Sequence, residues 1–302
     1  MKNRSASWHF YKLYIGSHHD GMDFLITQGL TQALAYAPDS PWFFLRYIDE
    51  KGLHLRVRFL LQEKDSQRLE TAIYAALHDA LNSLPLRPAN LWTPLVSFRG
   101  NTPFPTHELP VHCERAEYEP ETDVYGGETG IGIAEALFHQ SSDIARAILL
   151  AEAGGGMTRK EFALPLMLAM LETFIPVARR SAFLESFSTF WLAGSADIGM
   201  IKNSFTDRAW ELIDENSVLL SPQIRQDAQS AELVDRWQSA LDQTRRNYER
   251  HCERYSDGLA KNLAFQFMHL MNNRLGLSTL DEAWLAVLLS KSLESGVIHA
   301  SS

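Results

Sequence analysis

The chain has 302 residues, of which 45% are hydrophobic and 22% charged, a mixture that argues against a disordered or fibrous protein. Its formal net charge of −9 argues against a general affinity for nucleic acid, because phosphate binding needs a concentrated basic face. No stretch approaches the roughly 18 consecutive apolar residues of a membrane span, and the N-terminus lacks the apolar run of a signal peptide, so we expect a cytoplasmic protein without a membrane partner.

The first half of the sequence alternates predicted strands with predicted helices. Runs rich in aromatic or β-branched residues predict strands over residues 8–15, 41–48, 53–60 and 111–118. The turn Asp49-Glu50-Lys51-Gly52 joins the second and third of these strands into a hairpin. Apolar residues at helical spacing predict helices over 21–35 and 66–81, and the proline-rich stretch 85–110 predicts a long connection.

The second half is mostly helical by the same criteria. Apolar residues at helical spacing predict helices over residues 131–152, 159–178, 181–193, 205–215, 226–254, 257–273 and 280–294. No period of about 20 to 50 residues recurs, which excludes a solenoid. We therefore expect an α+β fold within a single domain over residues 1–302, in which an N-terminal mixed sheet with helices precedes a largely helical C-terminal half.

No spacing in the sequence is typical of a metal or cofactor site. Cys113 and Cys252 lie far apart and outside any CxxC motif, which supports neither zinc nor a disulfide framework. The glycines that begin at Gly126-Gly127 read GGxxGxG and lack the order and the preceding strand of a dinucleotide fingerprint. We expect no metal and no organic cofactor.

The strongest local signal is the predicted strand Leu53-His54-Leu55-Arg56-Val57-Arg58-Phe59. Side chains alternate between the two faces of a strand, so His54, Arg56 and Arg58 share one face. Two guanidinium groups about 7 Å apart on a rigid sheet can hold carboxylates as a clamp. The alternative is a solvated sheet face that carries charged residues, and periodicity alone favours that alternative.

Two further segments carry polar residues that allow more than one interpretation. Glu121 lies in an acidic run before Tyr125 and its two following glycines, where it is either a carboxylate near a helix N-terminus or an ordinary surface acid. His269 and Asn273 lie four residues apart on a predicted helix and so share a face. A lone histidine on a helix is more often a structural residue than a catalyst.

Six ordered blocks of the sequence form a recognisable set. They are residues 8–14 (WHFYKLY), 42–47 (WFFLRY), 54–59 (HLRVRF), 118–121 (YEPE) with 125–127 (YGG), 134–138 (AEALF) and 273–276 (NRLG). No single block is specific, but the ordered set is, and it covers essentially the whole chain. Taken together, these segments resemble the SpaB C-terminal, or thiopeptide-type bacteriocin biosynthesis, family, which includes the elimination domains of lantibiotic dehydratases.

The resemblance implies an enzyme that removes glutamate from glutamylated Ser or Thr side chains of a ribosomally made precursor peptide, leaving dehydroalanine or dehydrobutyrine. Arg56 and Arg58 fall on the arginines that would hold the glutamate carboxylates or the developing anion. Glu121 falls on the family's glutamate, and His269 on the histidine expected to move the proton, for which an imidazole pKa near 6.5 is suitable. The resemblance also implies substrate-binding positions at Arg46, His54, Tyr125, Asn273 and Arg274.

The resemblance has one departure, at Val124, where family members often carry an arginine. Losing a guanidinium from a glutamate pocket removes a charge-assisted contact commonly worth about 1.5–3 kcal/mol. Either Arg46, Arg56 and Arg58 are enough to bind the glutamate, or the substrate carries no glutamate. Two alternatives therefore stay open: a thiopeptide-type pyridine synthase that joins two dehydroalanines by cycloaddition, and a non-catalytic domain that holds the leader peptide.

The resemblance also implies the partners of the protein. The expected substrate is a precursor peptide with a leader segment, bound in a groove between the sheet and the helices. A separate glutamylating dehydratase subunit and a homodimer are the expected protein partners. Neither the identity of the precursor nor that of the modified residues follows from the sequence.

Overall fold

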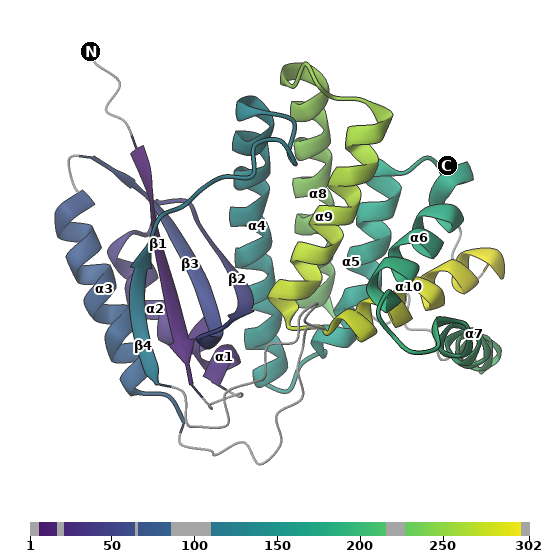
Figure 1. Cartoon of the computed structure of the whole chain (residues 1–302), viewed down its shortest axis with the longest axis horizontal. Helices are drawn as coiled ribbons and strands as arrows, with labels where there is room; N and C mark the ends of the chain where they lie inside the picture. The colour runs from purple at the N-terminus through teal and green to yellow at the C-terminus, as the bar shows by residue number, and fades with distance from the viewer. Residues whose placement is uncertain (1–5, 17–20, 64–65, 86–109, 216–226, 297–302) are drawn as a thin grey trace.

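The computed structural model describes residues 6–16, 21–63, 66–85, 110–215 and 227–296. Its N-terminal half is built on a four-stranded sheet in the order β2-β3-β1-β4 (Figure 1). The strands are β1 (Ala6–Ile15), β2 (Trp42–Asp49), β3 (Gly52–Gln62) and β4 (Val111–Ala116). The predicted strands and the predicted hairpin between β2 and β3 are therefore confirmed. Most of the predicted long connection, residues 86–109, lies outside the described residues.

Every described strand pairing is antiparallel, whereas the sequence led us to expect a mixed sheet. The connection from β1 to β2 passes over β3, and the connection from β3 to β4 passes over β1. Strands that run in the same direction are therefore always separated by one strand that runs the other way. This β-α-β-β-α-β order is that of the ferredoxin-like motif.

The helices between these strands pack against one face of the sheet (Figure 1). They are α1 (Gly21–Phe24), α2 (Leu30–Tyr36) and α3 (Ser66–Asn82). Tyr11 of β1 packs against Tyr74 of α3, and the fully buried Leu13 and Leu55 share that face. A π-helical segment, Leu25–Gly29, interrupts the helix predicted over residues 21–35.

The C-terminal half is helical, as predicted, and meets the sheet at β2 through α4 (Glu128–Ala153) and α9 (Asp257–Leu275). Its other helices are α5 (Arg159–Phe174), the short η2 (Val177–Arg179), α6 (Arg180–Leu192), α7 (Ile198–Asp214), α8 (Ala228–His251) and α10 (Thr279–Glu294). The start of α7 lies earlier than predicted because the side chain of Asp197 accepts a hydrogen bond from the backbone of Met200 and caps the helix.

One cluster of buried apolar residues runs through the sheet and the helices together, from Phe59 in β3 to Trp237 in α8 and Phe267 in α9. This burial explains the apolar composition of several helices. In the described part of the chain, no single helix is long and apolar enough to cross a membrane, although Arg159–Phe174 and Val177–Leu192, bent by 118°, reach that length and composition as a pair.

Candidate active site

A cavity of about 270 Å³ lies where the sheet meets α4 and α9. Its walls come from β2 and β3, from the segment that precedes α4, and from the last turns of α9. Among the residues that the sequence singles out, His54 does not line the cavity. Those that do are Arg46, Arg56, Arg58, Glu121, Tyr125, His269, Asn273 and Arg274. Segments from opposite ends of the chain thus line one cavity.

Arg58 is a buried cation whose guanidinium group faces three aromatic rings. Its Cζ lies 4.1 Å from the ring centre of Phe10, 5.0 Å from that of Phe43 and 4.8 Å from that of Tyr118. Its Nε and Nη1 have no hydrogen-bond partner. Burial lowers the pKa of Arg58 to about 10, so the group is still charged at neutral pH. The polar face of β3 is therefore not a solvated charged surface at this position.

Arg56 and His54 lie on the same face of β3 as Arg58. Arg56 packs over Tyr47, with its Cζ 3.3 Å from the ring centre. Its Nε donates to Nε2 of His54 at 3.3 Å, and Nδ1 of His54 lies 3.1 Å from the carbonyl oxygen of Gly52. Burial lowers the pKa of His54 to about 4, so its ring is neutral. His54 therefore contacts Arg56 inside the protein, whereas the sequence led us to expect a substrate contact.

Arg46 and Asn273 join β2 to the end of α9. The Asn273 side chain accepts from the backbone N–H of Arg46 at 3.0 Å and donates to its carbonyl oxygen at 3.0 Å, as a neighbouring strand would. The guanidinium of Arg46 donates to Asp23 at 2.6 Å and to the carbonyl oxygen of Arg274 at 3.1 Å. Both residues line the cavity, but these polar groups are engaged within the protein.

Arg274 is a second buried cation in the cavity wall. Its Nε donates to the hydroxyl of Ser142 at 3.1 Å and its Nη1 to the carbonyl oxygen of Leu270 at 3.0 Å, while Nη2 has no partner. Burial lowers the pKa of Arg274 to about 9. Within the described residues, neither Arg58 nor Arg274 forms an ion pair with a carboxylate. Two such cations in one cavity favour an anionic ligand.

His269 is hydrogen-bonded to a buried carboxylate. Its Nδ1 lies 2.9 Å from Oε1 of Glu282, and its ring centre lies 4.4 Å from that of Trp191. Only 1% of the Glu282 side chain is exposed, and its Oε2 accepts from Asn272 at 3.3 Å. Burial raises the pKa of Glu282, and the neighbouring imidazole opposes that rise. When Nδ1 donates to the carboxylate, Nε2 keeps its lone pair.

Glu282 is not among the candidate site residues that the sequence indicates. Ser278 and Asp281 form a capping box at the start of α10, and an acid at the next position is ordinarily explained by the positive end of the helix dipole. One signal points to the interior instead. Ala286 and Leu289 lie four and seven positions after Glu282, share its helix face and are fully buried. An acid on an apolar stripe needs a buried partner.

Glu121 and Tyr125 lie on the segment that leads into α4. Glu121 is exposed at the cavity, and its negative charge raises the pKa of Arg58 against the larger effect of burial. Tyr125 is buried and stacks on Phe267, with the ring centres 6.0 Å apart. Gly126 follows with a φ of +89°, and a Cβ there would lie 2.8 Å from the side chain of Leu259. The glycine lets the chain pass close to α9 and bring Tyr125 to the cavity.

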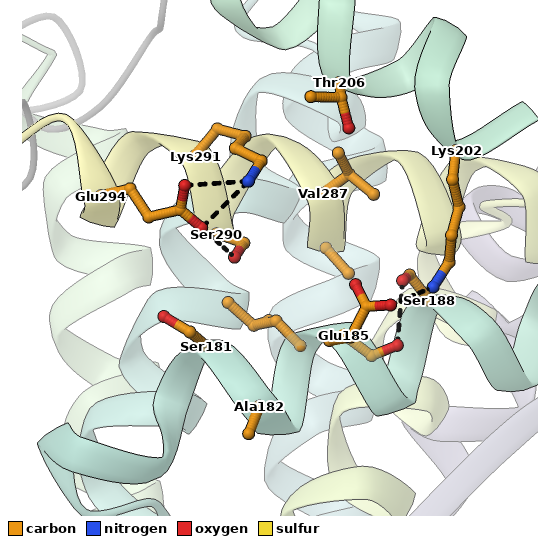
Figure 2. A pocket seen from close by; sticks show the side chains of 12 residues that line it. Ser181, Ala182, Glu185, Ser188, Lys202, Thr206, Val287, Ser290, Lys291 and Glu294 are labelled. Atoms are coloured by element: carbon orange, nitrogen blue, oxygen red, sulfur yellow. Dashed lines mark hydrogen bonds and ion pairs between the residues drawn. The ribbon is translucent and has the colours of Figure 1, made fainter. Parts of the chain in front are cut away.

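A second cavity, of about 330 Å³, lies between α6, α7 and α10 and has a different charge pattern (Figure 2). Lys202 pairs with Glu185, and Lys291 pairs with Glu294 at 2.8 Å. Its lysines are therefore already neutralised, unlike the arginines of the first cavity. No group of three His, Cys, Asp or Glu residues able to hold a metal ion occurs among the described residues.

The chain is similar to a known protein family and to solved structures of other proteins. The family described as lantibiotic biosynthesis dehydratase C-terminal matches residues 8–293. The solved structure of the tRNA-dependent lantibiotic dehydratase MibB from Microbispora sp. 107891 is similar, with a TM-score of 0.66 and 19% identity over 97% of this chain and 28% of that chain. The pyridine synthase TbtD from thiomuracin biosynthesis has a TM-score of 0.69 and 17% identity, over 96% of this chain and 99% of that chain.

A third solved structure, TsrL, has a TM-score of 0.60 and 14% identity, over 98% of this chain and 97% of that chain. At such identities these structures show a common fold alone, and the chain spans only 28% of the length of the dehydratase. No curated protein matches the chain. Because the family match covers residues 8–293, the chain belongs to the lantibiotic biosynthesis dehydratase C-terminal family.

Proposed function

We propose that the protein is a lyase that eliminates glutamate from glutamylated Ser or Thr residues of a ribosomally made precursor peptide. One observation carries the proposal: the same cavity holds two buried arginines that form no ion pair with a described carboxylate, and a histidine for whose Nε2 the described residues provide no hydrogen-bond partner. Elimination of this kind needs a base for the α-proton and a positive site for the departing carboxylate.

In the proposed reaction, Nε2 of His269 removes the α-proton of the modified residue, and the electron pair of that bond forms the double bond between Cα and Cβ. The bond between Cβ and the ester oxygen breaks, and its electron pair leaves with the glutamate as a carboxylate. Arg58 and Arg274 hold the resulting negative charge. The imidazolium that forms lies against Glu282, which stabilises its positive charge.

The dimensions of the cavity support a ligand of amino-acid size. Pockets for drug-sized ligands have volumes of roughly 300–1,000 Å³, and this cavity has about 270 Å³. A glutamyl group fits such a volume while the rest of the peptide stays outside. We propose that the peptide enters with its leader segment attached, and that a separate dehydratase subunit supplies the glutamylated residue.

Mass spectrometry of a glutamylated precursor incubated with the protein tests this function. We expect each modified site to lose one glutamate and to become dehydroalanine or dehydrobutyrine. The His269→Ala variant is expected to leave the glutamylated peptide intact, whereas His251→Ala, which removes an exposed histidine of α8, is expected to be as active as the wild type. A fully active His269→Ala variant would show that the proposed base is wrong.

A second candidate function follows from Val124. This side chain is half-buried against the apolar core, and its carbonyl oxygen accepts from Asn262 at 2.9 Å. The segment beside the cavity thus offers no guanidinium there, which favours a substrate without glutamate, such as the paired dehydroalanines of a pyridine synthase. That enzyme leaves a glutamylated peptide unchanged and converts a dehydrated one with loss of water and leader. A protein that binds the precursor but changes neither peptide is a leader-binding scaffold.

A further inference from the structure

Glu282 places a carboxylate in the buried junction between α9 and α10. Both of its oxygens are used, one with Nδ1 of His269 at 2.9 Å and the other with Asn272 at 3.3 Å. Burying a carboxylate has a large desolvation cost, and a glutamine in its place is expected to satisfy the same neighbours more cheaply. Asn272 is able to adapt to such an amide by a flip, because its own Oδ1 has no hydrogen-bond partner.

What the carboxylate adds over an amide is charge. A full negative charge beside Nδ1 favours the tautomer that carries its proton there, and it stabilises the ring once Nε2 has taken a second proton. An amide has no such preference, because it can either accept from Nδ1–H or donate to an unprotonated Nδ1. The hydrogen bonds alone therefore do not explain the carboxylate, whereas a defined tautomer of His269 does.

The imidazole ring is held from a second direction by Trp191 of α6. The two ring centres lie 4.4 Å apart at an interplanar angle of 33°. Trp191 is itself packed among Phe187, Phe190 and Phe265, with ring centres 4.8 to 6.1 Å away. This packing opposes rotation of His269, so Nδ1 stays toward Glu282 and the opposite edge of the ring stays toward the cavity.

We infer that Glu282 is a positioning residue that holds His269 in the tautomer with its proton on Nδ1 and its Nε2 lone pair presented to the cavity. The inference rests on the proposed function, because it names the unit that moves the proton in that reaction. It differs from a purely structural role for Glu282 in one respect: the charge of residue 282, and not only its hydrogen bonds, controls the rate.

Nitrogen-15 NMR of histidine-labelled protein tests the tautomer directly. The chain has 11 histidines, so the His269 signals are assigned by their absence from a His269→Asn variant. In the wild type at a pH where the ring is neutral, we expect Nδ1 to have the shift of a protonated nitrogen and Nε2 that of an unprotonated one. A neutral ring protonated on Nε2 in the wild type would overturn the inference, and this measurement needs no folded Glu282 variant.

Kinetics of Glu282→Gln supply the second part of the test. We expect kcat to fall by about 10²- to 10⁴-fold with little change in KM, together with loss of the single tautomer. Glu282→Asp keeps the charge and is expected to retain the tautomer and more of the rate. Glu294→Gln is the matched control, because Glu294 lies near the other end of α10 and pairs with Lys291 at the second cavity (Figure 2).

The outcomes separate this inference from the proposed function. If Glu282→Gln keeps the wild-type tautomer and rate, or loses rate and thermal stability while the tautomer is unchanged, Glu282 has no positioning role. If the wild type releases no glutamate but Glu282→Gln loses the Nδ1-protonated ring, the positioning role stands and the lyase proposal fails.

Discussion

The guanidinium group of Arg46 lies flat against the bare backbone of Gly276. A Cβ built on Gly276 would come within 2.9 Å of the Arg46 Cζ and 3.0 Å of Nη1, closer than atoms of this kind pack. Gly276 also ends α9 with a φ of +81°, a conformation that side chains other than glycine rarely adopt. Glycine is therefore required at position 276 for two reasons: its backbone conformation and the close contact with the Arg46 guanidinium group.

The Gly276→Ala variant is expected to lower the free energy of unfolding by about 1–3 kcal/mol, because it forces a side chain into the left-handed region and displaces Arg46. Urea unfolding measures the loss. Gly132→Ala is the matched control, since an added Cβ there meets no atom within 4 Å and φ is unremarkable. That exposed helical position is expected to gain up to about 1 kcal/mol. Equal stabilities for the two variants would contradict the packing argument.

The Arg58→Met variant is expected to separate stability from function. Because Arg58 is buried and forms no ion pair with a carboxylate among the described residues, an apolar side chain of similar length is expected to leave the free energy of unfolding unchanged or to raise it by about 1–3 kcal/mol. Turnover of the glutamylated peptide is expected to fall by about 10- to 150-fold through loss of a charge-assisted contact. Arg246→Met, at an exposed position of α8, is expected to change neither quantity. If Arg58→Met is less stable than the wild type but has normal turnover, Arg58 serves stability and does not bind the substrate.

Free glutamate is expected to raise the thermal unfolding midpoint of the wild-type protein more than glutamine does at the same ionic strength. The difference arises because Arg58 and Arg274 bind the extra carboxylate, and a ligand at 100 times its Kd adds about 2.7 kcal/mol to the free energy of unfolding. Differential scanning fluorimetry of the wild type and an Arg58→Met, Arg274→Met double variant measures the effect. Equal shifts for both amino acids, or a shift that persists in the double variant, would argue against an anion site.

His54 is expected to make stability depend on pH. Burial lowers its pKa from 6.5 to about 4, so between these pH values the unfolded chain binds a proton that the folded protein does not. The free energy of unfolding is therefore expected to fall as the pH decreases from 6.5 toward 4, by about 3 kcal/mol for the whole shift. Urea unfolding across this range should show a smaller decrease for His54→Gln than for the wild type. His251→Gln serves as the exposed control, and superimposable profiles for wild type and His54→Gln would exclude the effect.

Structural features that depend only on residues close together in the sequence could be predicted from it. Alternation along β3 correctly placed Arg56 and Arg58 on one face, because side-chain direction in a strand is a local property. α9 ends at Leu275, two residues beyond the predicted end at residue 273, and Gly276 after it is a local stop signal.

Features that depend on distant segments could not be predicted in this way. The burial of Arg58 requires Phe10 and Tyr118, which belong to other segments, so periodicity favoured a solvated face. The antiparallel order of the sheet follows from how the helical connections cross it, which no single segment specifies. Glu282 has a local explanation as a helix-start acid. The apolar stripe that follows it indicates burial, but no local pattern identifies His269 of the preceding helix as its partner.

The paired hydrogen bonds between Asn273 and the backbone of Arg46 have a mechanical consequence. Asn273 lies one turn beyond His269 on α9. It is hydrogen-bonded to β2, and β2 is paired with β3, the strand that carries Arg56 and Arg58. The proposed base, His269, and the proposed anion-binding residue Arg58 are thus joined through one set of backbone and side-chain hydrogen bonds. A hinge motion between the sheet and the helices at this point would first have to break these two hydrogen bonds, so the arrangement of these groups does not depend on a substrate being bound.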